Sequence, residues 1–434
     1  MSHPRDLFVA LAALSVFACG GAGDPVAPVP EAQPKPKIVV TTLVRDFDPS
    51  ATRHDATWVA YEQAPGQWAP VTPVRPGTYE IDATGAPWAV AIACADVDDA
   101  LTSVTVHRRS ASTTTLSFVL DRQCTGLSDA HTLTGTLRNL PPLSGWFDFG
   151  YVDEARGVAI PTDASTPYEL VNVFDGTWDL AFGVRTSPGS PLTRVALLRR
   201  ELVAADHTLD VDLAGPSSFV PSTKPIVVRG MTATENLQPI VRYTAGGAAG
   251  LDVGPPDVPP TVPDVKGEYA TFPASLRQEN DRYRATILAR DGEEVFERIV
   301  RFSIKEPIDV DVTLPPPMTV PVVSLAPAPG APSSLVRSRV AATGGPDAHY
   351  AIRARVRLRG RQDHRWVTTF DAATAGAAID DTMVDLSRVP GYRARWSLPL
   401  GETIEVTASL TEAERPFGDG TTHRVTSAKA FVAP

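Results

Sequence analysis

The sequence predicts an all-β protein built from serial β-sandwich modules. Short runs in which apolar and polar residues alternate recur along most of the chain, and Gly, Pro, Asp and Asn interrupt them, as is typical of strands and turns. Pro accounts for 41 of the 434 residues, which disfavours long helices because Pro breaks helix interiors. A β-propeller is the alternative of suitable length, but the repeat of about 40–50 residues that it requires is not visible.

The first residues have the features of an export signal. After His3 and Arg5, an apolar stretch runs from Leu7 to Ala18, and Cys19 follows. Twelve apolar residues are too few to cross a bilayer, which needs about 20. The segment resembles a bacterial lipoprotein signal peptide, whose lipobox ends in the Cys that is lipidated. The matching residues are Val16, Phe17, Ala18 and Cys19.

The resemblance implies that residues 1–18 are removed and that Cys19 carries palmitate and other acyl chains. Several such chains would attach the protein stably to a membrane, since each buried CH₂ contributes about 0.8 kcal/mol. Gly20 after the Cys resembles the sorting pattern of outer-membrane lipoproteins, so we expect a location in the cell envelope, at the outer membrane. An ordinary secretory signal is the alternative, and Val16 fits its cleavage site less well.

A Pro-rich segment, residues 19–37, contains the lipidated Cys and predicts an extended tether of up to about 55 Å. Two similarities at an offset of 99 residues, one around Gly77 and Gly176 and one around Asp210 and Asp309, indicate modules of about 100 residues. We therefore expect β-sandwich modules at residues 38–127, 128–222, 223–322 and 323–434. Chance similarity between strands is the alternative.

Two Pro-rich stretches bear on the module boundaries. The stretch Pro315–Pro332 is predicted to be a linker, and Val253–Asp264 is an alternative boundary inside the third module. Residues 130–215, with TLTGTLRNLP and PYELVNVFDGTWDLAF, resemble the prealbumin-like sandwich of the carboxypeptidase regulatory type. That resemblance implies a fold and no activity, and an immunoglobulin-like sandwich is the other form expected.

Two cysteines remain once Cys19 is assigned to the lipid. Cys94 and Cys124 each follow an alternating strand, and export permits a disulfide between them. On the loop-entropy model such a bridge would contribute about 3–4 kcal/mol. Two buried thiols are the alternative. We expect no metal site, because neither Cys belongs to a CxxC pair and no His lies at ligand spacing.

The sequence contains none of the familiar local signatures of catalysis. HExxH, GxSxG, SxxK, CxxC, a Walker-type loop and a GxGxxG helix start are all missing, so we expect no enzyme activity, no catalytic residue and no cofactor. The net charge of −10 argues against a nucleic-acid partner. Asp96, Asp98 and Asp99 could offer oxygens to Ca²⁺, but a solvated turn is the simpler interpretation.

The sharpest local pattern is AIRARVRLRGR, in which Arg occupies every second position. As a strand this segment would present one face of guanidinium groups, suited to phosphate, sulfate or carboxylate. Arg393 and Arg395 could extend that face from a neighbouring strand, whereas pairing with Glu402 and Glu405 would leave little net field. The arginines concerned are Arg353, Arg355, Arg357, Arg359 and Arg361.

These patterns leave two hypotheses for function. The first is an envelope lipoprotein, joined to the membrane through its covalent lipid, that has a non-catalytic binding or scaffolding role and docks another envelope protein. The second is binding of an anionic surface polysaccharide, or of lipid phosphates, through the Arg353–Arg361 face. An enzyme whose catalytic groups meet only in the folded chain is a further alternative.

Overall fold

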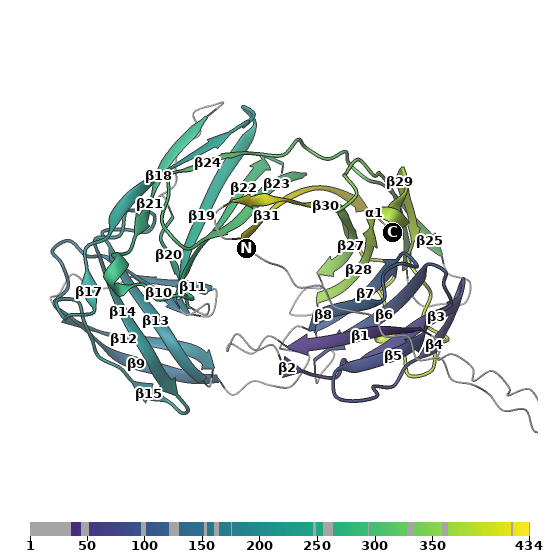
Figure 1. Ribbon diagram of the computed structural model, residues 1–434, viewed down its shortest axis with the longest axis horizontal. Helices are drawn as coiled ribbons and strands as arrows, with labels where there is room; N and C mark the ends of the chain where they lie inside the picture. Colours follow the sequence, from purple (N-terminus) through teal and green to yellow (C-terminus); the bar gives the residue numbers. More distant parts are fainter. Residues whose placement is uncertain are drawn as a thin grey trace, which may run out of the picture. The chain divides into compact units, whose positions relative to one another are not determined.

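The computed structural model confirms that the chain is nearly all β-strand (Figure 1). Its one α-helix in the described part, α1 (Ala372–Ala375), is four residues long, and two 3-10 turns are also present, η2 (Ala274–Leu276) and η3 (Ala394–Trp396). The structure describes residues 36–44, 52–96, 101–120, 130–151, 154–159, 165–174, 176–245, 249–254, 264–293, 295–327, 334–357, 363–417 and 420–433.

The described strands form six sheets, and the widest contains twelve strands. In spatial order its strands are β20 (Ala249–Asp252), β19 (Glu235–Ala245), β22 (Arg282–Asp291), β23 (Phe296–Ile304), β31 (Gly420–Val432), β30 (Ile404–Phe417), β27 (His349–Arg357), β28 (Asp363–Asp371), β7 (Leu101–Arg109), β6 (Trp88–Ala95), β3 (Trp58–Ala64) and β4 (Gln67–Pro70). The propeller alternative requires equivalent blades, whereas these sheets differ in width, from three to twelve strands.

Five smaller sheets accompany it, each named here after one of its strands. The β1 sheet contains β1 (Lys37–Val44), β2 (Thr52–Arg53), β5 (Thr78–Asp82) and β8 (Thr115–Leu120), and the β9 sheet contains β9 (Ala130–Arg138), β12 (Ser165–Phe174), β15 (His207–Thr208) and β16 (Val211–Asp212). The β10 sheet contains β10 (Trp146–Tyr151), β11 (Glu154–Ala159), β13 (Gly176–Arg185), β14 (Arg194–Val203) and β17 (Ser218–Phe219). The β18 sheet contains β18 (Ser222–Arg229), β21 (Val265–Thr271) and β24 (Val310–Thr313), and the β26 sheet contains β25 (Val322–Pro327), β26 (Ser334–Ala341) and β29 (Ala378–Thr382).

Hydrophobic cores form where two sheets face each other. The β1 sheet packs on β3 and β6, with Val40 and Ile92 fully buried, and the β9 sheet packs on the β10 sheet around Phe182. The β18 sheet packs on β19, β22 and β23, and the β26 sheet packs on β27, β28 and β30. Alternating side chains explain these layers, because every second residue of a strand points to the same side.

Three of the small sheets share one topology. In each, the first strand of the sheet pairs in parallel with a later strand: β1 with β8, β9 with β16, and β18 with β24. The similarity around Asp210 and Asp309 leads into equivalent strands, β16 and β24. The similarity around Gly77 and Gly176 instead leads into β5 and β13, which occupy different places in their sheets. Only the first similarity therefore matches a structural repeat.

The twelve-stranded sheet joins segments that are far apart in the sequence. β28 pairs in parallel with β7, so residues 363–370 lie beside residues 101–108, and β23 pairs with β31. Strands from three of the four segments that the sequence predicted as modules thus share one sheet, and the described residues from Lys37 onward belong to one compact unit. The predicted boundaries stay predictions.

The prediction that Pro315–Pro332 is a linker is wrong. Residues 322–327 within it form β25, which pairs with β26, and Met318 is buried in the core under the β26 sheet. An edge strand tolerates Pro where no ladder hydrogen bond is needed, so a Pro-rich composition did not prevent pairing here. Several predicted strands are confirmed, including those at 132–140, 282–290 and 402–410, which overlap β9, β22 and β30.

Candidate anion-binding face

The Arg-rich strand of the sequence is β27, and its two sides have different surroundings. Ile352, Ala354 and Val356 are buried in the core shared with the β26 sheet. Arg353 and Arg355 therefore point to the opposite side, where Arg353 is exposed and Arg355 is half-buried. Two arginines of the predicted row therefore lie on one side of β27.

Other predicted members of the row are described less fully. Arg357 ends β27, and its side chain lies outside the described residues. Arg359 and Arg361 also lie outside them. The candidate site must therefore be assembled from what neighbouring strands place beside Arg353 and Arg355.

The strands on either side of β27 add both a cation and an anion to this face. Arg355 stands directly opposite Arg365 of β28 and directly opposite Glu405 of β30. Residues that stand opposite each other in an antiparallel pair share a face, and their Cβ atoms lie only about 5 Å apart. Two guanidinium groups and one carboxylate thus meet across three adjacent strands.

Two further strands extend the same face. Lys429 of β31 stands opposite Thr407, which stands opposite Arg353. The Lys429 Nζ lies 3.9 Å from a carboxylate oxygen of Glu297 on β23, and the Arg290 Nε of β22 lies 3.0 Å from the same oxygen. We call this set the basic face. It consists of Arg290, Arg353, Arg355, Arg365 and Lys429, with the acids Glu297 and Glu405 among them.

The electrostatics of the basic face are visible in Arg353. The pKa of Arg353 is lowered from its usual range, first because surrounding side chains exclude water from part of the guanidinium group, and then because Arg365 and Arg355 repel it. Glu297 and Glu405 act in the opposite direction and raise the pKa. Like charges on neighbouring strands destabilise a sheet. An anion bound among these guanidinium groups would relieve that repulsion.

The proposed extension of the face by Arg393 and Arg395 is wrong. Neither lies on a strand: Arg393 precedes η3, and Arg395 is inside it. The Arg393 guanidinium carbon lies 5.4 Å above the ring of Trp396, which is buried in the core under the β26 sheet. A cation–π contact therefore holds Arg393 near that core. Glu402 is exposed ahead of β30, so of the two acids that the sequence suggested as partners, Glu405 is the one that stands opposite an arginine of β27.

The remaining predicted site residues fall into two groups. Cys94 is described and lies buried in β6. The lipobox, the lipidated Cys and the tether up to residue 35 lie outside the described residues, as do Asp98, Asp99 and Cys124, so the lipid and the disulfide stay predictions. Among the described residues, Asp96 included, no group of three or more His, Cys, Asp or Glu side chains could hold a metal ion.

Sequence reasoning missed Arg290, Arg365, Glu297 and Lys429. Each lies in an ordinary alternating strand and stands out in no local pattern. Only the register between β22, β23, β31, β30, β27 and β28, which lie side by side in Figure 1, brings them together.

No helix within the described ranges is long and apolar enough to cross a bilayer.

The chain matches no protein-family model, and no curated protein is detectably similar to it.

Proposed function

We propose that this chain is a lipid-anchored, non-catalytic binding protein of the cell envelope whose ligand is an anionic polymer of the cell surface. The observation that carries the proposal is the basic face, where Arg353, Arg355 and Arg365 gather on one side of a single sheet. Guanidinium groups bind carboxylate, sulfate and phosphate through paired N–H donors. Rigid strands hold these donors in fixed positions, which favours a repeated anionic ligand.

The rest of the chain supports this role. We infer that the predicted lipid on Cys19 and the predicted Pro-rich tether hold serial two-sheet modules away from the membrane. The four hydrophobic cores between sheets are consistent with such modules. In this arrangement the basic face would meet polymer outside the headgroup layer.

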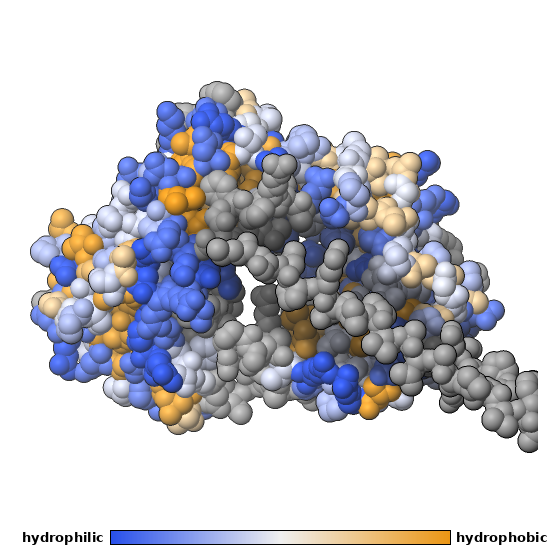
Figure 2. Space-filling model, viewed as in Figure 1, coloured by the Kyte–Doolittle hydropathy of each residue, from blue (hydrophilic) through white to orange (hydrophobic). Residues whose placement is uncertain are grey.

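Docking of another envelope protein is the second candidate, and one residue favours it. Phe431 is 63% exposed and stands opposite Glu405, on the same side of the sheet as Arg355. Exposed aromatic and Arg side chains are enriched at protein interfaces. In the view of Figure 2, however, hydrophobic residues form separate groups among hydrophilic ones, which suits a polar ligand better than a large apolar interface.

Reversing two charges on the basic face tests the proposal. We expect the full-length protein to be retained on an immobilised acidic polysaccharide at about 0.15 M salt, where exposed charges are screened beyond about 8 Å. The R353E/R355E variant is expected to pass through without retention, because two positive charges are replaced by two negative ones and the net charge of the face falls by four units. Affinity chromatography of detergent-solubilised protein measures this.

A matched control is available outside the basic face, in the segment between β29 and η3. Arg388 is exposed between Leu386 and Val389, which are buried in the core under the β26 sheet. The R388E variant should keep its retention. Equal retention of the wild type and R353E/R355E would refute polymer binding at this face, and crosslinking that returns one stoichiometric protein would favour the docking alternative.

Removing the lipidated Cys tests the anchor separately. The Cys19→Ala variant should move from the membrane fraction to the soluble fraction, because the acyl chains supply the hydrophobic attachment. Ultracentrifugation of lysed cells in high salt, followed by immunoblotting, measures the distribution. A variant that still sediments with membranes would show that the anchor lies elsewhere.

A further inference from the structure

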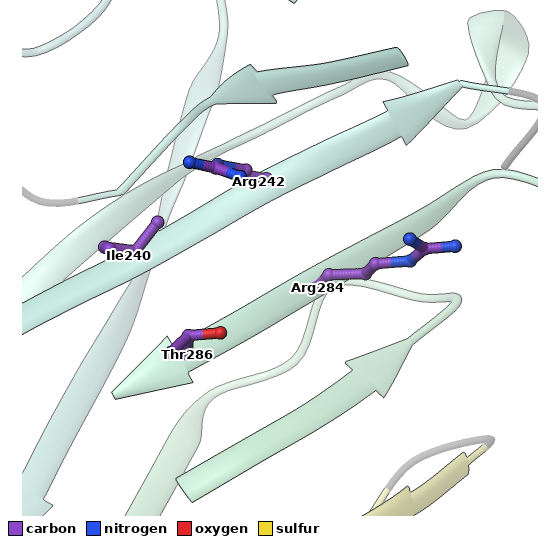
Figure 3. A pocket seen from close by; sticks show the side chains of 4 residues that line it. All are labelled: Ile240, Arg242, Arg284 and Thr286. Atoms are coloured by element: carbon purple, nitrogen blue, oxygen red, sulfur yellow. The ribbon is translucent and has the colours of Figure 1, made fainter. Parts of the chain in front are cut away.

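A depression of ≈ 350 Å³ lies on β19 and β22 (Figure 3). On β22 its lining residue Thr286 is four residues from Arg290, which marks one end of the basic face. Its lining includes Ile240 and Arg242 from β19 and Arg284 and Thr286 from β22. The antiparallel register places Arg242 directly opposite Arg284, and Ile240 directly opposite Thr286. Two cations, a hydroxyl and an aliphatic side chain therefore share one small area.

This depression opens on the same side of the twelve-stranded sheet as the basic face. The residues between its lining residues, including Val241 and Ala285, are buried in the core under the β18 sheet. Following the register from Thr286 leads to Arg301 of β23 and then to His423 of β31. Glu297 of the basic face is four residues from Arg301 on β23. Because residues an even number apart on a strand share one side, Glu297 and Arg301 point to the same side of the sheet.

The described residues beside the depression carry charges of both signs. Arg301 is exposed beside it, and Asp252 of β20 stands opposite Arg242. In Figure 3, the guanidinium groups of Arg242 and Arg284 extend in opposite directions along their strands. They do not converge on one small anion. Diverging cations instead suit successive charges of a polymer.

We infer that this depression is a second contact site for the same acidic polysaccharide, which lies across the sheet from the arginines of β27, along the basic face, to β19 and β22. The inference rests on the proposed function and adds to it a minimum ligand length. Arg284 and Arg353 are separated by four strand spacings and by about eight residues along the strands, or roughly 30 Å. A free phosphate or a single lipid headgroup cannot span that distance.

The lining also favours a sugar polymer. Ile240 and the aliphatic stems of Arg242 and Arg284 offer apolar surface to the C–H face of a sugar ring, while the guanidinium groups meet its acidic substituents. A nucleic acid would be bound mainly through a strongly basic surface, and the chain carries a net charge of −10. Acidic polysaccharide is therefore the partner to which we commit.

Heparin fragments of defined length test the inference by isothermal titration calorimetry on the full-length protein. Fragments longer than about 30 Å should bind the wild type at least tenfold more tightly than short ones, because the second contact becomes intramolecular. The R284E variant should lose this gain and keep its affinity for short fragments within about twofold. The milder R284Q variant should show the same trend, and R388E should behave as the wild type.

The outcomes separate the two proposals. If R284E and R284Q bind long fragments as tightly as the wild type, while R353E/R355E binds them weakly, the second site is wrong and the proposed function stands. If the wild type binds no fragment of any length, the proposed function itself fails. Circular dichroism of each variant confirms that the change acts on binding and not on folding.

Discussion

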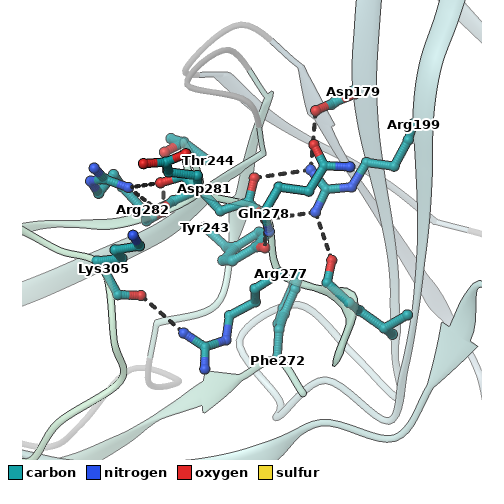
Figure 4. A network of polar contacts seen from close by, with 12 residues as sticks. Asp179, Arg199, Tyr243, Thr244, Phe272, Arg277, Gln278, Asp281, Arg282 and Lys305 are labelled. Carbon is teal, nitrogen blue, oxygen red and sulfur yellow. Dashed lines mark hydrogen bonds and ion pairs between the residues drawn. The ribbon is translucent and has the colours of Figure 1, made fainter. Parts of the chain in front are cut away.

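The Asp281→Ala variant should lose about 3–5 kcal/mol of the free energy of unfolding, since it removes one partner of a buried ion pair and leaves the other partner's charge poorly compensated. Asp281 is 1% exposed and lies just before β22. Its carboxylate accepts hydrogen bonds from the Arg199 guanidinium, at 2.9 and 2.6 Å, from the Tyr243 hydroxyl and from the Gln278 N–H (Figure 4). The Tyr243 hydroxyl and the Gln278 N–H would lose this acceptor together, and Arg199 would lose its closest carboxylate.

The same network connects two parts of the fold. Arg199 belongs to β14 of the β10 sheet, whereas Asp281 and Tyr243 belong to the region of β19 and β22. Arg199 also donates to Asp179 and to the Leu276 carbonyl oxygen. Burial lowers the pKa of Arg199 and the hydrogen bond with Asp281 raises it, with a net increase. Asp281 thus contributes most to the stabilisation of this desolvated guanidinium group, and Asp179 adds to it.

Urea unfolding followed by circular dichroism measures the loss. The Lys37–Asp82 pair is the matched control, because its side chains are 48% and 58% exposed and water screens their attraction. The Asp82→Ala variant should leave the free energy of unfolding nearly unchanged. An equally small change for Asp281→Ala would mean that the buried network does not stabilise the fold.

The strands were predictable from sequence, but the sheets that they form were not. Alternation at 282–290 and 352–358 is local, so it indicated β22 and the larger part of β27 directly. Pairing is not local: β7 and β28 are more than 250 residues apart in the chain, and nothing in either strand identifies the other. The predicted linker shows the same limit, because Pro-rich composition outweighed the weak alternation of β25.

The candidate site divides in the same way. Arg353 and Arg355 were found because five arginines alternate within one short segment of the sequence, a pattern that needs no partner. Arg365, Arg290 and Lys429 each come from a different strand, and their contribution depends on register, where a shift of one residue would turn them to the other face. Arg242 and Arg284 were missed for the same reason, since each is a single charge in its own strand.

The stability of the fold toward acid should depend strongly on His107. This residue lies on β7, 5% exposed, where its Nδ1 contacts the Thr369 hydroxyl at 2.8 Å and the Arg109 guanidinium at 3.2 Å. Burial first, and then the positive charge of Arg109, lower its pKa from 6.5 to about 3. The folded chain therefore keeps the imidazole neutral, whereas the unfolded chain binds a proton below about pH 6.5.

The sign of the effect follows from this difference in proton binding. A depressed pKa gives stability that is present above the unfolded pKa and is lost as the pH falls, here from about 6.5 toward 3. Between pH 7 and pH 4 His107 should account for a loss of about 3 kcal/mol. The His107→Asn variant keeps an acceptor near the Nδ1 position and cannot be protonated. As the pH falls from 7 to 4, its free energy of unfolding should therefore rise relative to that of the wild type by about 3 kcal/mol.

A neighbouring acid provides a control with the opposite sign. Asp381 of β29 is 5% exposed, and burial raises its pKa to about 6, although Arg108 opposes the shift. Its protonated form is favoured in the folded chain, so acidification from pH 7 to pH 4 should stabilise the wild type by about 2 kcal/mol through this group. As the pH falls from 7 to 4, the free energy of unfolding of the Asp381→Asn variant should therefore fall relative to that of the wild type, whereas that of the His107→Asn variant should rise. Parallel stability curves for all three proteins, measured by urea unfolding at each pH, would show that neither buried group governs the acid response.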